Sequence, residues 1–336
     1  MIHLFTRENG IRKIVDVKDF RPYFYIHEED VGLCRDLEIE PANYVSPKGE
    51  HALKVYTQLP SDVPVYRERF KHTFEADVLF PLRYQIDAVD SIEPTQSKIF
   101  YIDTEVNSVG RIPDVVLAKD EVICVGVYDS IGRTYSTFIW SPNVAKGKID
   151  TIFDGTLHEI HYFTNEQAML EGLVQFFMDE GPDLLVGWNL MRFDLMYLIN
   201  RMPQVRVDAN LLSPMKFVIA HAAKDLQIKG LSLADLYDVY RRFASSGEES
   251  YKLDFIARKV IGEGKTESDN NVRYLWKNDL NRLIEYNATD VKLTRRIDEK
   301  LQLTDFLDEM RRMAFCRLED TMTISRLSDA YILKTF

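Results

Sequence analysis

The chain has 336 residues, of which 46% are hydrophobic and 28% are charged, and its formal net charge at pH 7 is −11. This composition is that of a globular protein, and the length corresponds to roughly two domains. The acidic balance argues against a protein that coats nucleic acid through a basic surface, although it leaves room for an enzyme that grips phosphate through metal ions.

Three features of the sequence bear on its cellular compartment. The longest apolar runs, such as residues 122–128, are far shorter than the roughly 20 residues that span a bilayer. Charged residues occur near the N-terminus where a signal peptide would need its apolar core. The cysteines Cys34, Cys124 and Cys316 show neither zinc-site nor disulfide spacing, so free thiols are expected. We therefore expect a cytoplasmic protein without a membrane segment.

The first part of the chain alternates short strand-like runs with turns. Asn9-Gly10 is a strong two-residue turn signal, and the flanking residues predict a β-hairpin around it. Further predicted elements are strands within 22–30 and 51–59 and a helix capped by Ser61 or Asp62. Residues 87–97 are polar and contain a proline, which makes them the predicted domain boundary.

From residue 98 onward, apolar strands are followed by helices. The predicted strands are 98–106, 122–130, 133–140 and 182–189. The predicted helices are 165–181, 190–202, 231–243, 251–262 and 280–301, with a loop at 262–271. Strands that alternate with helices in this way indicate an α/β fold with a mixed central sheet.

Two carboxylates lie close together in the predicted strand 98–106. Alternation puts Asp103 and Glu105 on one face of this strand and Ile102 and Thr104 on the other. The ordinary interpretation is a solvated strand edge, and the alternative is half of a metal site. The apolar strands nearby indicate a central strand, where an acidic pair without a counter-charge would be costly.

A second polar group follows the predicted strand 182–189. Asn189 lies near a helix start, and Phe193 and Asp194 follow about one turn later. An N-cap and a first-turn acid are the ordinary interpretations of Asn189 and Asp194. However, the apolar neighbours of Asp194 suggest that its carboxylate needs a counter-charge.

The third group is Tyr286 and Asp290, which share one helix face because they are four residues apart. Such a pair alone means little. Together with Asp103, Glu105 and Asp194, it supplies carboxylates from a strand, a strand-to-helix junction and a helix. This arrangement could converge on a pair of divalent ions, and ligands that are all oxygen favour Mg²⁺ or Mn²⁺ over Zn²⁺.

These motifs resemble those of the family B DNA polymerases, in the 3′–5′ proofreading exonuclease domain of the DEDDy type. The matching motifs are "DTE" at 103–105, "NLMRFD" at 189–194 and "YNATD" at 286–290. The N-terminal part, with "FRPYFYI" and "VLFPLRYQID", is similar to the archaeal members, so the resemblance covers nearly the whole chain. It implies a small β-rich N-terminal domain at 1–97, an RNase H-like α/β exonuclease domain at 98–300, and a helical segment at 301–336 that could pack back on the N-terminal domain.

The resemblance implies hydrolysis of the 3′-terminal phosphodiester of DNA by two divalent ions, Mg²⁺ or Mn²⁺. Asp103, Glu105 and Asp290 would hold the tighter ion, and Asp103 with Asp194 would hold the looser one. Tyr286, helped by Glu105, would orient the attacking water. The implied partner is DNA with a single-stranded or frayed 3′ end.

The resemblance also implies substrate contacts from Asn189, Phe193 and Thr104. The first motif of the family usually reads Asp-Ile-Glu-Thr, whereas Thr104 lies between the two acids here and Val106 follows them. The metal ligands are therefore expected to be intact, while the fit around the terminal nucleotide is expected to differ from that in the family.

A further expectation concerns the N-terminal domain. Archaeal relatives bind template uracil in a pocket of this domain, and Pro22, Ala52, Phe80 and Arg83 fall at matching positions. The alternative is that these residues simply pack a small β-rich domain.

The polymerase motifs D-x-x-S-L-Y-P and Y-x-D-T-D-S do not occur in the sequence. Polymerase catalysis would therefore need a palm domain on a second chain or in a longer product. An inactive exonuclease-like scaffold that only binds DNA is the alternative to an active nuclease. A free-standing nuclease that acts on RNA is a third hypothesis, and the polymerase-like N-terminal part argues against it.

Overall fold

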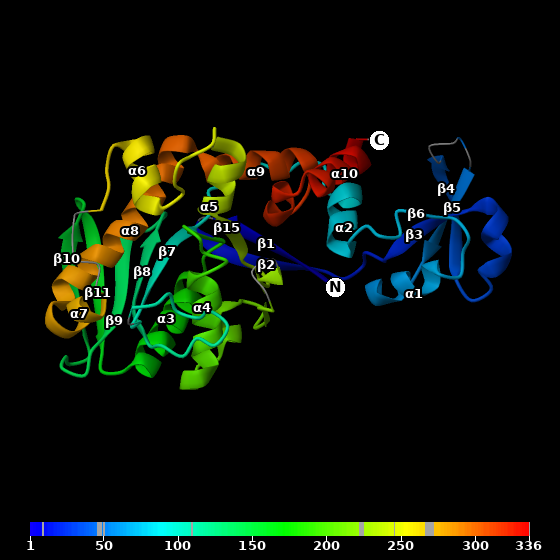
Figure 1. The fold of residues 1–336 in the computed structure, drawn as a ribbon. Coiled ribbons are helices and arrows are strands. Elements are labelled where there is room, and N and C mark those ends of the chain that lie inside the picture. Colours follow the sequence, from blue (N-terminus) through cyan, green and yellow to red (C-terminus); the bar gives the residue numbers. More distant parts are fainter. Residues whose placement is uncertain are drawn as a thin grey trace. The chain divides into compact units, whose positions relative to one another are not determined.

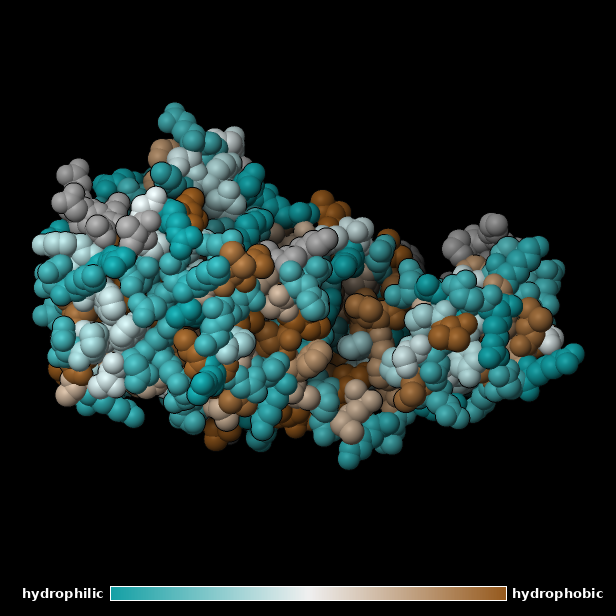
Figure 2. Space-filling view, turned by 60° about the horizontal axis from the view of Figure 1, so that its bottom comes forward, coloured by the Kyte–Doolittle hydropathy of each residue, from teal (hydrophilic) through white to brown (hydrophobic). Residues whose placement is uncertain are grey.

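The computed structural model describes residues 1–336 except 9, 46–48, 50, 109, 222–224, 245, 266–271 and 336. The chain divides into two compact units, Met1–Pro94 with Arg311–Phe336, and Thr95–Met310. Within the described residues, no helix combines the length and apolar character that a membrane crossing requires. The face shown in Figure 2 is mostly hydrophilic, with hydrophobic residues scattered between polar ones. The cysteines Cys34, Cys124 and Cys316 are buried free thiols, as predicted.

The first unit contains two small antiparallel sheets. Strands β1 (Ile2–Glu8) and β2 (Ile11–Val17) form the predicted hairpin, with Ile2 opposite Val17. Gly10 has a φ of +77°, which favours glycine at this turn, and Asn9 lies outside the described residues. The second sheet has the strand order β4 (Glu38–Val45), β5 (His51–Tyr56), β3 (Tyr23–His27) and β6 (Thr73–Phe74).

The helices of the first unit are short. They are the 3₁₀ segments η1 (Glu28–Leu33), η2 (Pro60–Asp62) and η7 (Leu318–Met322), and the α-helices α1 (Val63–Arg67), α2 (Phe80–Ala88) and α10 (Ile324–Thr335). The helix predicted after Ser61 or Asp62 is thus confirmed only as a short segment. Lys334 in α10 donates to the carbonyls of Ile86 and Val89 at 2.8 and 2.7 Å, which attaches this helix to the end of α2.

The second unit is built on a seven-stranded mixed sheet, which confirms the predicted α/β class. Its spatial order is β10 (Gly147–Phe153), β11 (Thr156–Phe163), β9 (Thr134–Trp140), β8 (Val122–Asp129), β7 (Ile99–Val106), β12 (Leu184–Gly187) and β15 (Ser232–Asp235). Strand β7 runs antiparallel to β8 and parallel to β12. Strand β12 is also parallel to β15, so the carboxyl ends of β7, β12 and β15 meet at one edge of the sheet.

Helices of the second unit cover the sheet (Figure 1). The α-helices are α3 (Glu166–Glu180), α4 (Asp194–Arg201), α5 (Leu236–Val239), α6 (Leu253–Ile261), α7 (Val272–Asn278), α8 (Leu280–Leu301) and α9 (Leu303–Ala314), the last of which continues into the first unit. Smaller segments are η3 (Met202–Val205), η4 (Ala209–Leu212), the π-helical Tyr240–Ala244, and the two-residue strands β13 (Val218–Ile219) and β14 (Gln227–Ile228). Helix α3 begins and ends as predicted, because Asn165 caps it and Gly181 adopts a φ of +54°.

Two sequence predictions about these elements are wrong in part. Residues 231–243 were predicted as one helix, but Ser232–Asp235 form strand β15 and only the following residues are helical. The reason is that pairing with β12 determines the structure of this segment, and that pairing cannot be seen in local periodicity. Helix α4 begins at Asp194 rather than near residue 190, and Asn189 has a φ of +68° instead of the extended backbone of an N-cap.

The two faces of strand β7 differ in character, one being apolar and the other polar. Phe100 points to α3, where its ring lies 5.3 Å from that of Phe176. Tyr101 points the other way and donates its hydroxyl to Asp298 of α8 at 2.7 Å. By alternation, Asp103 and Glu105 share the face of Tyr101 and lie under α8.

A row of basic residues on α8 is neutralised by two acidic residues from other segments. Asp154, in the β10–β11 turn, accepts hydrogen bonds from Arg295 and Arg296 at 3.3 and 2.9 Å. Glu263, which follows α6, pairs with Lys292 at 3.1 Å and also with Arg296. These ion pairs connect the hairpin, helix α8 and the segment before Lys265.

Candidate metal centre and nuclease site

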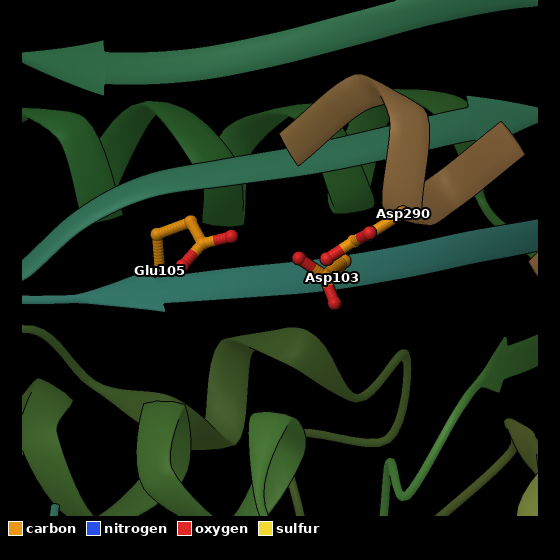
Figure 3. Close-up of side chains that lie close together, drawn as sticks. All are labelled: Asp103, Glu105 and Asp290. Atoms are coloured by element: carbon orange, nitrogen blue, oxygen red, sulfur yellow. The ribbon is translucent and has the colours of Figure 1, made fainter. Parts of the chain in front are cut away.

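Three of the predicted carboxylates come together beneath α8. Asp103 and Glu105 on β7 and Asp290 on α8 each offer an oxygen, and these oxygens lie within 4.8 Å of one another. In Figure 3 the carboxylates of Asp103 and Asp290 point toward each other, and Glu105 lies farther along the same strand. One strand and one helix, nearly 190 residues apart in sequence, thus build a compact acidic cluster.

Asp194, the fourth predicted carboxylate, lies beside this cluster rather than within it. Strands β7 and β12 pair only between Ile99–Tyr101 and Leu184–Val186. Beyond this ladder, the backbone N–H of Thr104 needs another acceptor, and Asp194 Oδ1 accepts it at 2.9 Å. Burial, and then the charge of Asp103, raise the pKa of Asp194 well above its usual range, so the two carboxylates interact electrostatically.

Burial disfavours the ionised forms of these carboxylates and therefore raises their pKa values. Burial and the charge of Asp290 raise the pKa of Asp103 to about 7. Burial, followed by the charges of Asp103 and Asp290, raises the pKa of Glu105 well above its usual range. Burial also raises the pKa of Asp290, although Lys265 opposes the shift. Since each group raises the pKa of a neighbour, the cluster favours either protons or a cation.

Lys265 is a residue of this site that sequence reasoning missed. Its ammonium lies 2.5 Å from Asp290 Oδ2 and 3.2 Å from the Tyr286 hydroxyl, above whose ring it lies at 4.8 Å. Burial disfavours its charge, but Asp290, Tyr286 and Asp103 together raise the pKa of Lys265. The residue was assigned only to a loop at 262–271, of which 266–271 lie outside the described residues.

The backbone of Lys265 is held by helix α6. Its N–H donates to Asp254 Oδ1 at 2.6 Å, and its carbonyl accepts from Arg258 at 2.9 Å. Asp254 and Arg258 are four residues apart and also pair with each other at 3.1 Å. A segment without regular structure therefore presents its lysine in a defined place.

Tyr286 keeps its phenolic proton at neutral pH. Burial, and then the charges of Asp290 and Glu105, raise the pKa of Tyr286 to about 12. Its oxygen accepts a hydrogen bond from Lys265, so its own O–H remains a donor. Such a hydroxyl, next to Glu105 and Asp290, can donate to a water or hydroxide at the cluster.

The segment with Asn189 and Phe193 is held from below by Asp235, a second residue that sequence reasoning missed. Asp235 ends β15 and accepts the backbone N–H groups of Asn189 at 2.9 Å and Met191 at 3.1 Å. These bonds hold Asn189 in its left-handed conformation, and the ring of Phe193 lies 5.9 Å from that of Tyr197. The sequence does not indicate this role of Asp235, because local periodicity predicts a helix over 231–243 instead of the strand that Asp235 ends.

The structure does not bring the side chain of Thr104 into the acidic cluster. Thr104 is buried on the opposite face of β7 from Asp103 and Glu105, and only its backbone N–H reaches Asp194. Its hydroxyl has no hydrogen-bond partner among the described residues. A role in substrate contact would therefore have to be indirect.

The four N-terminal residues predicted for a uracil pocket are only partly brought together. Arg83 and Phe80 lie on α2, where Arg83 is buried, pairs with Glu75 and lies over the ring of Tyr23 at 5.1 Å. Pro22 directly precedes Tyr23 in the chain. Ala52, however, is paired with His27, whereas Tyr23 is paired with Tyr56. Ala52 is thus four residues, or about 13 Å, along β5 from Tyr56, the residue opposite Tyr23.

The donor set of the acidic cluster fits a hard divalent cation. All three groups are carboxylates, which Mg²⁺ and Mn²⁺ prefer. Asp290 Oδ1 is buried and has no hydrogen-bond partner among the described residues, so it has a free acceptor site that a cation would satisfy.

In the absence of divalent cations, the free energy of unfolding should decrease as the pH rises from about 4 through 7. The pKa of Asp103 is about 7 in the folded chain against 3.8 for an ordinary aspartate. The folded state therefore keeps a proton that the unfolded chain has released. The stabilisation is fully present below about pH 4 and is lost as the pH rises through 7.

Thermal melts in EDTA between pH 4 and 8 provide the measurement. The melting temperature of the parental protein should fall more steeply with rising pH than that of Asp103→Asn, which cannot titrate at this position. Added Mn²⁺ should raise the parental melting temperature more at pH 8 than at pH 5, because the cation needs deprotonated ligands. Identical pH slopes for both proteins in EDTA would contradict this assignment of the proton.

Comparisons with known proteins agree with this geometry. Residues 56–256 match the family described as DNA polymerase family B, exonuclease domain. The DNA-directed DNA polymerase of Escherichia phage RB69 is 26% identical over 286 residues, which cover 76% of this chain and 32% of the phage protein. The DNA polymerase of Pyrococcus horikoshii is 23% identical over 324 residues, which cover 88% of this chain and 25% of the archaeal protein. The chain thus spans about a third or less of the length of these two relatives.

Proposed function

Because the chain belongs to the family B DNA polymerases, as the portion that carries the exonuclease domain, we propose that it removes nucleotides from the 3′ end of DNA. The observation that carries the proposal is the convergence of Asp103, Glu105 and Asp290 in one cluster, in which Glu105 and Asp290 are buried and Asp103 is half-buried. We further propose that the activity is proofreading in DNA replication, with polymerase catalysis supplied by a palm domain on another chain or in a longer product.

The proposed chemistry assigns a separate task to each residue. Asp103, Glu105 and Asp290 would hold one divalent ion, and Asp103 with Asp194 a second. Bound ions would stabilise negative charge on the attacking and leaving oxygens of the phosphodiester. Tyr286 would orient the attacking water through its O–H, since the raised pKa keeps it protonated.

The segment above the sheet edge would place the 3′ end. Asn189 and Phe193 lie on the turn before α4, next to Asp194, so they are close to any group held by the cluster. Phe193 is partly exposed and can pack against a sugar or base. Such packing does not depend on base identity, as removal of any mismatched nucleotide requires.

Exposed arginines that lie over half-buried tyrosine rings near this turn support a nucleic-acid substrate. Arg192 lies over the Tyr237 ring at 5.6 Å, and Arg241 lies over Tyr237 and Tyr251 at 5.4 and 5.0 Å. Arginine combined with aromatic rings is typical of surfaces that bind single strands. This local basic group offers phosphate contacts on a chain whose net charge is −11.

Degradation of labelled oligonucleotides tests the proposal. A 5′-labelled single strand of DNA should give a ladder that shortens from the 3′ end in Mg²⁺ and should remain intact in EDTA. A matched RNA strand should be degraded more slowly. Tight DNA binding without hydrolysis in Mg²⁺ or Mn²⁺ would instead support the inactive scaffold, and faster hydrolysis of RNA would support an RNA nuclease.

A further inference from the structure

A glycine on β8 and an asparagine on α8 meet at the acidic cluster. Gly126 is paired with Asp103 across the β7–β8 ladder, and α8 crosses the sheet at this point. A Cβ atom built on Gly126 would lie 2.2 Å from Asn287 Oδ1 and 3.1 Å from Asn287 Cγ. Any larger residue at 126 would thus occupy the space that Asn287 needs.

Asn287 uses this space to reach Asp103. It is fully buried, and its Nδ2 donates to Asp103 Oδ2 at 2.8 Å and to the Asp103 carbonyl at 3.2 Å. The orientation of the amide follows from chemistry, because both neighbouring atoms are oxygens and only the NH₂ group can donate to them. The amide oxygen has no hydrogen-bond partner among the described residues and points at Gly126.

We propose that Asn287 is a positioning residue for Asp103, and that Gly126 is present to admit it. The inference rests on the proposed metal-dependent hydrolysis, and it adds a residue that makes no contact with metal or substrate itself. By holding Oδ2 and the backbone carbonyl, the amide limits rotation of the Asp103 side chain. The second oxygen of this carboxylate is then presented toward Glu105 and Asp290.

The hydrogen bonds from Asn287 matter because, without them, the Asp103 side chain could rotate away from the other two carboxylates. The negative charges of Glu105 and Asp290 repel Asp103, and rotation of its side chain would relieve the repulsion. Hydrogen bonds from residues behind a metal ligand typically change metal affinity or activity by about 10- to 100-fold.

Binding of Mn²⁺ by titration calorimetry, together with hydrolysis of single-stranded DNA, tests the role of Asn287. In Asn287→Ala, Mn²⁺ affinity should fall by about tenfold, and kcat at a fixed low Mg²⁺ concentration should fall in parallel, while KM for DNA changes little. Val291→Ala is the matched control, because Val291 is equally buried one turn farther along α8 and also lies against Gly126, but its side chain has no group that can donate a hydrogen bond to Asp103. It should lower the melting temperature without changing Mn²⁺ affinity by more than about twofold.

The pair Gly126→Ala and Gly126→Ala/Asn287→Ala separates positioning from general damage. Gly126→Ala alone should displace the Asn287 amide and weaken Mn²⁺ binding as Asn287→Ala does. In the double variant the added methyl group enters the space left by the amide, so the losses should not add.

Mn²⁺ binding and kcat at parental values in Asn287→Ala would overturn the proposal, as would equal losses of Mn²⁺ affinity in Asn287→Ala and Val291→Ala. Failure of the proposed function looks different: the parental protein would then bind Mn²⁺ without degrading DNA. In that case calorimetry still decides whether Asn287 positions Asp103.

Discussion

Simultaneous replacement of Asp103 and Glu105 by alanine is expected to slow the hydrolysis of single-stranded DNA in Mg²⁺ by at least about 1,000-fold. The two side chains are two of the three groups of the acidic cluster, and one carboxylate cannot hold a divalent ion against water. Loss of metal-based charge stabilisation costs several kcal/mol, and about 4 kcal/mol corresponds to a 1,000-fold change in rate. The measurement is single-turnover degradation of a 5′-labelled strand.

The fold should survive this double replacement. Asp103 and Glu105 repel each other and Asp290, so their removal in EDTA relieves an unfavourable interaction. The matched control is Glu171→Ala with Asp179→Ala on α3, two carboxylates whose bonds are to Gln167 and Gln175 on the same helix. Parental degradation rates in the Asp103 and Glu105 variant would remove the cluster from the mechanism.

Lys265→Met is expected to lower kcat by about 10- to 100-fold, which is the range for loss of a group that supports a metal ligand. Methionine keeps the length of the side chain and removes its charge. Without the ammonium, Tyr286 loses the hydrogen bond that orients its oxygen, and Asp290 loses its ion pair. KM for DNA should change little, because the Lys265 ammonium interacts with Asp290 and Tyr286 and not with the Asn189 and Phe193 turn proposed to place the 3′ end.

A double-mutant cycle tests whether Lys265 and Tyr286 act as a unit. Tyr286→Phe alone should also lower kcat, and the combined variant should be no slower than the worse single variant. Lys259→Ala on α6 is the control, since Lys259 pairs with Glu248 at 2.6 Å and does not touch the cluster. Full additivity of the two losses would show that Lys265 acts independently of Tyr286.

Local sequence patterns predict much of this fold. The alternation in 98–106 predicts the strand and assigns Asp103 and Glu105 to one face, because side-chain direction in a strand is a local property. Caps predict α3 for the same reason, since Asn165 and Gly181 act on their own backbone. The four-residue spacing of Tyr286 and Asp290 likewise places both on one side of α8.

Contacts that depend on how distant segments meet could not be predicted. Lys265 lies in a polar stretch, and its proximity to Asp290 arises only because α6 holds its backbone. Asn287 is an ordinary polar helix residue until Gly126 brings the sheet close enough for its amide to reach Asp103. Asp235 accepts the backbone N–H of Asn189 only because β15 pairs with β12, and a local pattern does not contain that pairing. A single sequence contains these residues but not their neighbours in space.

The ion pairs that α8 makes with Asp154 and Glu263 should make this protein sensitive to ionic strength in a second way, besides the binding of DNA. Salt weakens any grip on DNA phosphates, and it also screens partly exposed ion pairs. Glu263 is two residues from Lys265, and its side chain is 39% exposed where it pairs with Lys292. High salt would thus loosen the segment that carries Lys265 even when no DNA is bound. Reaction rates measured at saturating DNA should therefore still decline as salt is added.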